Sequence, residues 1–137
     1  MNNIIEFKYT SDLYGCFSNF SKHHIVYQDK EYFTSEHLYQ GLKHQHHPEI
    51  MELVRLADTP KEAKRIARSY PMWPNWDEIK IDQMRLVISL KLEQNPKIKE
   101  KLIETGDAII VERSSLRMSM ISHLFFNIQS QRRRANC

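Results

Sequence analysis

Three proline-marked helix starts constrain the fold of this sequence more than any other feature. Thr59-Pro60-Lys61-Glu62 combines a threonine suited to capping, a proline suited to the first helical position and a glutamate three residues after the cap. Pro48 can open a second helix, and Asn95-Pro96 can open a third that Gly106 would end. The chain is therefore expected to fold mostly into short, local helices.

The rest of the pattern predicts two more helices and a few strands. One helix is expected to begin near Thr34-Ser35, and a longer one to run from about Asp77 to Gln94. Strands are expected at residues 3–8, 24–27, 30–33 and 108–112, with the middle two forming a hairpin around Gln28-Asp29. The predicted fold class is α+β, mainly helical with a small β-sheet.

The length of 137 residues fits one domain, and no apolar run of 18 residues suggests a membrane span. The first residues lack the basic region and apolar core of a signal peptide, so a cytoplasmic location and no membrane partner are expected. Cys16 and Cys137 lie far apart in the sequence, which suggests neither a disulfide framework nor a zinc pattern.

The positive charge lies at one end of the sequence. Residues 1–113 contain 16 Lys and Arg and 17 Asp and Glu, giving −1, whereas residues 114–137 contain four arginines and no acid. Charge alone therefore argues against nucleic-acid binding by residues 1–113. The run Arg132-Arg133-Arg134 is interpreted as a solvated end, with a salt-sensitive nucleic-acid contact as the alternative.

On the first predicted helix, Glu36, Gln40 and Lys43 are spaced i, i+4 and i+7, so they share one face. Leu38 and Leu42 fall on another face and are expected to anchor the helix in the core. Such a polar row usually faces water. The alternative is a catalytic row, in which Glu36 acts as a base or stabilises a cation and Lys43 binds an anion or attacks a carbonyl.

A segment rich in aromatic residues and proline follows the third predicted helix. Arg68 and Trp76 flank residues 69–75, which can pack as a rigid wall or provide a stacking platform with Arg68 holding a phosphate. His44, His46 and His47 have no Cys, Asp or Glu cluster at ligand spacing, so we expect neither a metal nor a cofactor.

Several motifs occurring in a fixed order resemble the NADAR family, also called the YbiA-like family, over roughly residues 5–114. Shorter matches occur at Met84, Lys91 and Val111-Glu112. The longer motifs are Tyr14-Gly-Cys-Phe-Ser-Asn-Phe20, Ser35-Glu-His-Leu-Tyr-Gln-Gly-Leu-Lys43, Thr59-Pro-Lys-Glu-Ala-Lys-Arg-Ile-Ala-Arg68, Asn75-Trp-Asp-Glu-Ile-Lys80 and Leu102-Ile-Glu-Thr-Gly-Asp107.

The resemblance implies a YbiA-like α+β fold and chemistry at N-glycosidic bonds. One branch of the family is associated with hydrolysis of phosphoribosylamino-pyrimidine intermediates of riboflavin synthesis, and another with removal of ADP-ribose from modified guanine. The expected partner is thus a small phosphoribosyl or ADP-ribosyl substrate, with ADP-ribosylated nucleic acid as a further candidate. By position, the resemblance implies Glu36 and Lys43 as catalytic residues and, as substrate-binding residues, Gly15, Phe17, Ser18, Asn19, Phe20, Gln40, Arg68 and Trp76.

This assignment suits the chemistry of breaking a ribose C1–N bond. Positive charge develops at C1, so Glu36 can stabilise the transition state or activate water. Lys43 can instead form a Schiff base with the C1 aldehyde if the ribose opens. Two other functions remain open from the sequence: a non-catalytic binder of nucleotide or ADP-ribose, and a helical interaction domain with Glu36 and Lys43 on a wet face.

The resemblance ends abruptly near Ser114-Ser115. The family normally continues with an Asp-x-x-Trp-Gly segment, a glycine-rich stretch and a closing helix, but this sequence contains no Asp, Trp or Gly from Arg113 onward. We therefore expect a NADAR-like domain over residues 1–115 and an atypical tail over 116–137 that replaces the family's final segment. A frameshift, an alternative end or a sequencing error is the hypothesis for this difference, and resequencing the DNA would test it.

Overall fold

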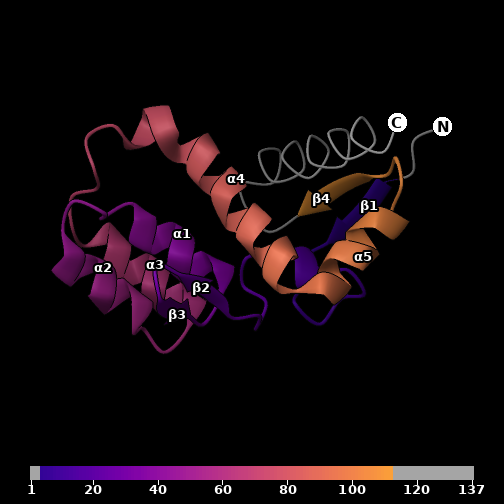
Figure 1. Ribbon diagram of the computed structural model, residues 1–137, viewed down its shortest axis with the longest axis horizontal. Helices are drawn as coiled ribbons and strands as arrows, with labels where there is room; N and C mark the ends of the chain where they lie inside the picture. The colour runs from indigo at the N-terminus through magenta and orange to yellow at the C-terminus, as the bar shows by residue number, and fades with distance from the viewer. Residues whose placement is uncertain (1–3, 113–137) are drawn as a thin grey trace. The chain divides into compact units, whose positions relative to one another are not determined.

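The computed structural model describes residues 4–112, which divide into two compact units (Figure 1). One unit combines residues 4–18 with 95–112, and the other is the continuous stretch 19–94. The predicted boundary at residue 115 and the tail 116–137 lie outside the described residues.

The first unit is built on a parallel strand pair from distant parts of the sequence. Strand β1 (Ile4–Phe7) pairs with β4 (Ile109–Glu112) so that Ile4 lies opposite Ile109. Helix α5 (Pro96–Glu104) leads into β4 through Gly106, whose φ of 59° is easily adopted by glycine. A short 3-10 turn, η1 (Gly15–Phe17), lies in the connection that follows β1.

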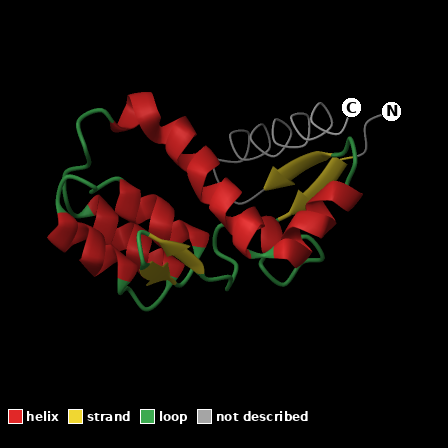
Figure 2. Cartoon of the chain, viewed as in Figure 1, coloured by secondary structure: helices red, strands yellow, loops and turns green. Residues whose placement is uncertain are grey.

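A two-stranded antiparallel hairpin opens the second unit, as the sequence predicts (Figure 2). Strand β2 (Ile25–Tyr27) pairs with β3 (Lys30–Tyr32). Gln28 and Asp29, the two turn residues, have φ values of 50° and 65°. Two consecutive positive φ values are the signature of the type I′ turn that matches strand twist. The predicted small sheet is thus two separate strand pairs.

Four helices complete the second unit, and their starts follow the predicted caps. Helix α1 (Ser35–Leu42) contacts α2 (Pro48–Arg55), α3 (Pro60–Arg68) and α4 (Trp76–Gln94). The side-chain oxygens of Thr34 and Thr59 accept hydrogen bonds from the third residue of α1 and α3 respectively. Thr59 and Glu62 are spaced as in a capping box, in which the glutamate side chain accepts a hydrogen bond from the backbone N–H of the capping residue. Here the Glu62 carboxylate accepts hydrogen bonds from Arg65 instead.

Apolar residues at helical spacing form the core of this unit. Leu38 and Leu42 of α1 are fully buried, as expected from their spacing. The inward face of α3 is also apolar, because Ala63 and Ala67 pack with Val54 and Ala57, and Ile66 lies against them. Within α2, Val54 is fully buried, whereas half of the surface of Leu53 is exposed.

Among the helices of residues 4–112, none combines the length and apolar character needed to cross a bilayer.

Candidate active site

Helix α1 carries a buried acid in its first turn. Glu36 has no exposed surface, and its backbone N–H donates to the carbonyl oxygen of Asn19 at 2.9 Å. One turn later, Gln40 Nε2 donates to Glu36 Oε1 at 2.8 Å. The i, i+4 spacing therefore produces a direct contact, and the alternative of a row facing water is wrong for Glu36 and Gln40.

The Gln40 amide also presents a polar atom that a ligand can use. Gln40 is 1% exposed, and its Oε1 accepts no hydrogen bond from any residue in the described range 4–112. A buried amide oxygen in this state costs free energy. A ligand N–H or O–H group placed there would recover that cost.

Lys43 is at the end of the same helix, against aromatic rings. Its Nζ is 5.7 Å from the centroid of the Tyr39 ring and 5.9 Å from that of the Trp76 ring. The two rings lie 5.3 Å apart, and Trp76 is buried at the start of α4. The Lys43 carbonyl accepts a hydrogen bond from Trp73 N at 2.7 Å, which holds the connection before α4 against α1. The structure thus brings Lys43 and Trp76 together through cation–π geometry.

Phe20 and Arg68 lie together beside α3, away from Lys43 and Trp76. They share the lining of a cavity of about 690 Å³ whose walls come from Phe20, Thr59, Ser69 and α3. No α1 residue lines this cavity, so the structure groups Arg68 with Phe20. Its phosphate-binding role in the glycosidase reaction stays a prediction.

Three predicted site residues belong to the first unit. Ser18 is buried, and its Oγ lies 3.5 Å from Glu112 Oε1. Phe17 is also buried, and its ring stacks on Tyr14 at 5.8 Å. Gly15 has a local structural requirement, because an added Cβ would lie 2.3 Å from the carbonyl oxygen of Thr10. The remaining residue, Asn19, begins the second unit, and its Nδ2 contacts Met84 Sδ at 3.3 Å.

Two buried charged residues were absent from the predicted site. Glu112 is 6% exposed at the end of β4, on the same strand face as buried Ile110. Lys91 is 2% exposed on α4, on the face that also buries Ile88 and Leu92. Each interrupts an otherwise apolar face at strand or helix spacing, and that interruption was the available sequence signal.

Lys91 takes part in a short polar chain. Its Nζ donates to Ser21 Oγ at 2.7 Å, and the same hydroxyl lies 2.9 Å from His23 Nδ1. Burial lowers the pKa of His23, and the nearby Lys91 charge lowers it further. The His23 ring is therefore held in its neutral form more strongly than a histidine in water.

His37 and His44 are buried, and their hydrogen bonds serve the fold. Burial lowers the pKa of both His37 and His44. His37 Nε2 donates to the carbonyl oxygen of Ala57 at 2.9 Å, and His44 Nε2 donates to that of Ala67 at 3.0 Å. Within the described residues, no three His, Cys, Asp or Glu side chains gather as metal ligands would.

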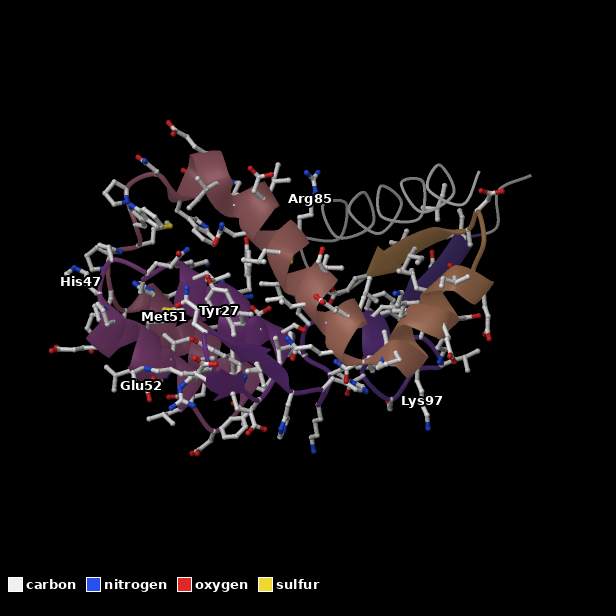
Figure 3. All side chains as sticks on the ribbon, in the orientation of Figure 1. Tyr27, His47, Met51, Glu52, Arg85 and Lys97 are labelled. Atoms are coloured by element: carbon white, nitrogen blue, oxygen red, sulfur yellow. The ribbon has the colours of Figure 1, made fainter. Side chains whose placement is uncertain are left out.

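A smaller hollow of about 160 Å³ lies between the hairpin and α2. Tyr27, Met51 and Glu52 are among its lining residues, and Figure 3 shows these labelled side chains on the hairpin and helix that form it. It contains none of the predicted site residues.

Comparisons with known proteins agree with this architecture. The chain is 39% identical over 105 residues to the N-glycosidase Npun_R5314 of Nostoc punctiforme, covering 74% of this chain and 67% of that protein. It is 36% identical over 115 residues to the N-glycosidase YbiA of Escherichia coli, covering 82% and 71%. The chloroplastic riboflavin biosynthesis protein PYRR of Zea mays is 36% identical over 128 residues, which cover 82% of this chain and 20% of that protein.

The fold comparison gives the same family. The NMR structure of Escherichia coli YbiA matches with a TM-score of 0.86 at 29% identity, covering 99% of this chain and 89% of that one. The sequence pattern that defines the NADAR domain matches residues 6–118. The chain therefore belongs to the NADAR domain family, with a YbiA-like α+β fold.

Proposed function

We propose that this protein is an N-glycosidase that hydrolyses the ribose C1–N bond of a phosphoribosylamino-pyrimidine or of an ADP-ribosylated nucleobase. Its relatives support the reaction class, because two of them are named N-glycosidases and a third is named a riboflavin biosynthesis protein. The observation that carries the proposal is the fully buried Glu36 carboxylate, held by Gln40. A buried acid is costly to keep in a fold without a use.

Glu36 is suited to the charge changes of this reaction. As the C1–N bond breaks, positive charge develops at C1, and a carboxylate beside it stabilises the transition state more than the ground state. Glu36 can also take a proton from water while the water oxygen bonds to C1. The electron pair of the broken bond leaves with the nitrogen, which takes up the proton that Glu36 removed from water. Gln40 fixes the carboxylate, since its amide donates to Oε1.

Lys43 offers a second route from the same helix. If the ribose ring opens, C1 becomes an iminium carbon that is still bonded to the nucleobase nitrogen. The neutral Lys43 amine can add to C1 and expel that nitrogen, which leaves with a proton from the amine, and water later hydrolyses the resulting Schiff base. The rings of Tyr39 and Trp76 lie within 6 Å of its Nζ, a distance at which aromatic faces attract a cation. In this route another group must remove the Lys43 proton, and Glu36 is the candidate on the same helix.

The test is release of ribose 5-phosphate by the purified full chain from a phosphoribosylamino-pyrimidine, with ADP-ribosyl-guanine as the second substrate. Glu36→Gln keeps the shape of the side chain and removes its charge, so we expect a loss in kcat of roughly 10²–10⁴-fold. Glu93→Gln is the matched control, because Glu93 is exposed on α4. Equal rates for wild type and Glu36→Gln would remove Glu36 from the mechanism.

A second candidate function is binding without turnover. It is favoured by the sequence from Arg113 onward, which lacks the acid and tryptophan of the family's usual closing segment. Calorimetric binding of ADP-ribose, combined with no product from either substrate, would support it.

A further inference from the structure

The hollow of about 160 Å³ between the β2–β3 hairpin and α2 has a well-packed apolar wall. Tyr32 of β3, which is 2% exposed, and Met51 of α2 both line this hollow. Both side chains also lie against Gly41 of α1, because a Cβ added there would be 3.4 Å from Met51 Cγ and 3.6 Å from Tyr32 Cε1. Contacts among three elements of the second unit therefore hold these two side chains in place.

Tyr32 brings a buried hydroxyl group to the hollow. Its Oη makes no hydrogen bond with any other residue between Ile4 and Glu112, although buried hydroxyls in proteins are usually hydrogen-bonded. Burial raises the pKa of Tyr32 to about 12, so the hydroxyl keeps its proton and is a donor. A buried donor without an acceptor costs free energy, and a ligand acceptor in the hollow would recover that cost.

Gln45 supplies the complementary polar group to the same lining. Its Nε2 donates to the carbonyl oxygen of Leu42 at 3.0 Å and to Gln83 Oε1 at 2.9 Å, which uses both amide hydrogens. These two bonds fix the orientation of the carboxamide. Its Oε1 accepts no hydrogen bond from the described part of the chain, so a ligand N–H group can bond to it.

The charges in the lining argue against an ionic ligand. Lys30 and Glu52 are its charged members, and Lys30 Nζ lies 3.3 Å from Glu52 Oε2. Hydrogen bonding from Arg55 lowers the pKa of Glu52 to about 2, so this carboxylate stays ionised and paired at neutral pH. The lining thus sums to zero charge, and an ion entering the hollow would lose its hydration without gaining an unpaired partner.

The volume of the hollow sets the size of the ligand. An enclosed cavity of about 150 Å³ is enough to hold a benzene molecule, so this hollow has room for one six-membered ring. Aromatic side chains combined with a few placed polar groups are typical of small-molecule sites. Tyr27 adds a second aromatic ring to the lining.

We propose that this hollow binds a neutral six-membered ring that carries a carbonyl next to an N–H group, as lactam heterocycles such as uracil do. The Tyr32 hydroxyl donates to the ring carbonyl, and Gln45 Oε1 accepts from the ring N–H. Tyr27 and Met51 contact the ring itself. This inference goes beyond the proposed hydrolysis and does not depend on it, because the hollow contains none of the predicted site residues.

The test is an NMR titration of the ¹⁵N-labelled full chain with 2-pyridone, the simplest aromatic ring of this class. We expect saturable shifts of the backbone N–H signals of Tyr27, Gln45 and Met51. Tyr32→Phe keeps the packed ring and removes only the hydroxyl, so affinity should fall roughly three- to ten-fold, as expected for one lost hydrogen bond. Tyr9→Phe is the matched control, because Tyr9 is exposed in the first unit and should bind as wild type does.

Changes in the ligand test the two polar contacts separately. N-methyl-2-pyridone keeps the carbonyl and lacks the N–H, so it should bind several-fold more weakly than 2-pyridone. Gln45→Met removes the acceptor, and with this variant the two ligands should bind about equally. Benzoate, a ring of the same size that carries a charge, should bind more weakly than either. Melting curves by circular dichroism establish that each variant is folded before affinities are compared.

Four results would overturn the proposal. They are the absence of saturable shifts, shifts confined to the part of α1 around Glu36, equal affinities of Tyr32→Phe and Tyr9→Phe, and binding of benzoate as tight as that of 2-pyridone. Glu36→Gln should keep wild-type affinity for 2-pyridone. Failure of ring binding would therefore leave the hydrolysis test unaffected, and failure of hydrolysis would leave this one unaffected.

Discussion

Gly15 and Gly41 differ in the space around them: the surroundings of Gly15 require a glycine, whereas those of Gly41 leave room for a methyl group. An added Cβ at Gly15 would lie 2.3 Å from the Thr10 carbonyl oxygen and 2.5 Å from that of Tyr9. At Gly41, inside α1, the nearest atom would be Met51 Cγ at 3.4 Å, which is ordinary contact. The resemblance assigns Gly15 to substrate binding, whereas its surroundings give a packing reason for glycine.

We therefore expect Gly15→Ala to lower the free energy of unfolding by about 1–3 kcal/mol, because backbone atoms must shift to admit the methyl group. Gly41→Ala is the matched comparison and should raise it by up to about 1 kcal/mol, since alanine is the better helix former. Urea denaturation of the two variants and wild type measures both effects. A Gly15→Ala variant as stable as wild type would contradict the packing argument.

The turn of the β2–β3 hairpin limits the stability of this strand pair. Its two turn residues, Gln28 and Asp29, both adopt positive φ, a conformation that costs side chains other than glycine free energy. Side chains of α2 contact the hairpin beside this turn. Lys30 Nζ donates to the Glu52 carboxylate at 3.3 Å, and Arg55 donates to the carbonyl oxygen of Glu31. Hydrogen bonding from Arg55 lowers the pKa of Glu52 to about 2. Side chains of α2 thus hold a strand pair whose turn is not optimal.

Asp29→Gly should stabilise this hairpin, because glycine adopts a φ of 65° without a steric penalty. The expected gain is up to about 1 kcal/mol in the free energy of unfolding, because relief of the left-handed strain, ~1–2 kcal/mol, exceeds the entropic cost of glycine, ~0.5–1 kcal/mol. Asp29→Val is the opposite control and should destabilise, since a β-branched side chain disfavours positive φ. Thermal denaturation of the three proteins measures the order, and Asp29→Gly below wild type would refute the turn argument.

The elements were predictable from local chemistry, whereas the partners of several side chains were not. Capping threonines and first-position prolines gave the starts of α1, α2, α3 and α5 within a residue or two, and Gln28-Asp29 correctly marked the hairpin. The spacing of Glu36 and Gln40 indicated a shared helix face but not whether that face was exposed to solvent or buried. Burial is set by packing between elements, which a single sequence does not encode locally.

The grouping of predicted site residues shows the same limit. The resemblance assigns ten residues to one site. In the structure, Arg68 shares a cavity with Phe20, whereas Lys43 lies beside the rings of Tyr39 and Trp76. Lys91 and Glu112 fall within the shorter matches of the resemblance and each interrupts an apolar face, but neither was placed among the predicted site residues. Only the fold shows that both are buried.

Across the whole molecule, two buried histidines and one half-buried histidine make stability depend on pH. Burial lowers the pKa of His23, His37 and His44 below the ordinary value of 6.5. Below pH 6.5 the unfolded chain therefore binds more protons than the folded one, and stability falls as pH falls. Their contribution is fully present above pH 6.5 and is lost progressively as the pH falls below that value.

We expect the urea midpoint to fall between pH 7 and pH 5, with each buried histidine contributing a slope of at most about 1.4 kcal/mol per pH unit. His37→Gln keeps a donor for the Ala57 carbonyl but does not titrate, so its profile should be flatter over this range. Urea titrations at four pH values, on wild type and variant, provide the measurement. Parallel profiles would exclude His37 as a source of the slope.

The pairing of β1 with β4 sets an order of assembly during synthesis. Strand β1 is made first, yet its partner Ile109–Glu112 is made only after the whole of residues 19–94. At ribosomal rates of ~5–20 residues per second, Ile4 and Ile5 wait on the order of ten seconds for that strand. The continuous second unit can form its helices in this interval. The nascent β1 edge is therefore the segment that a chaperone would need to shield longest.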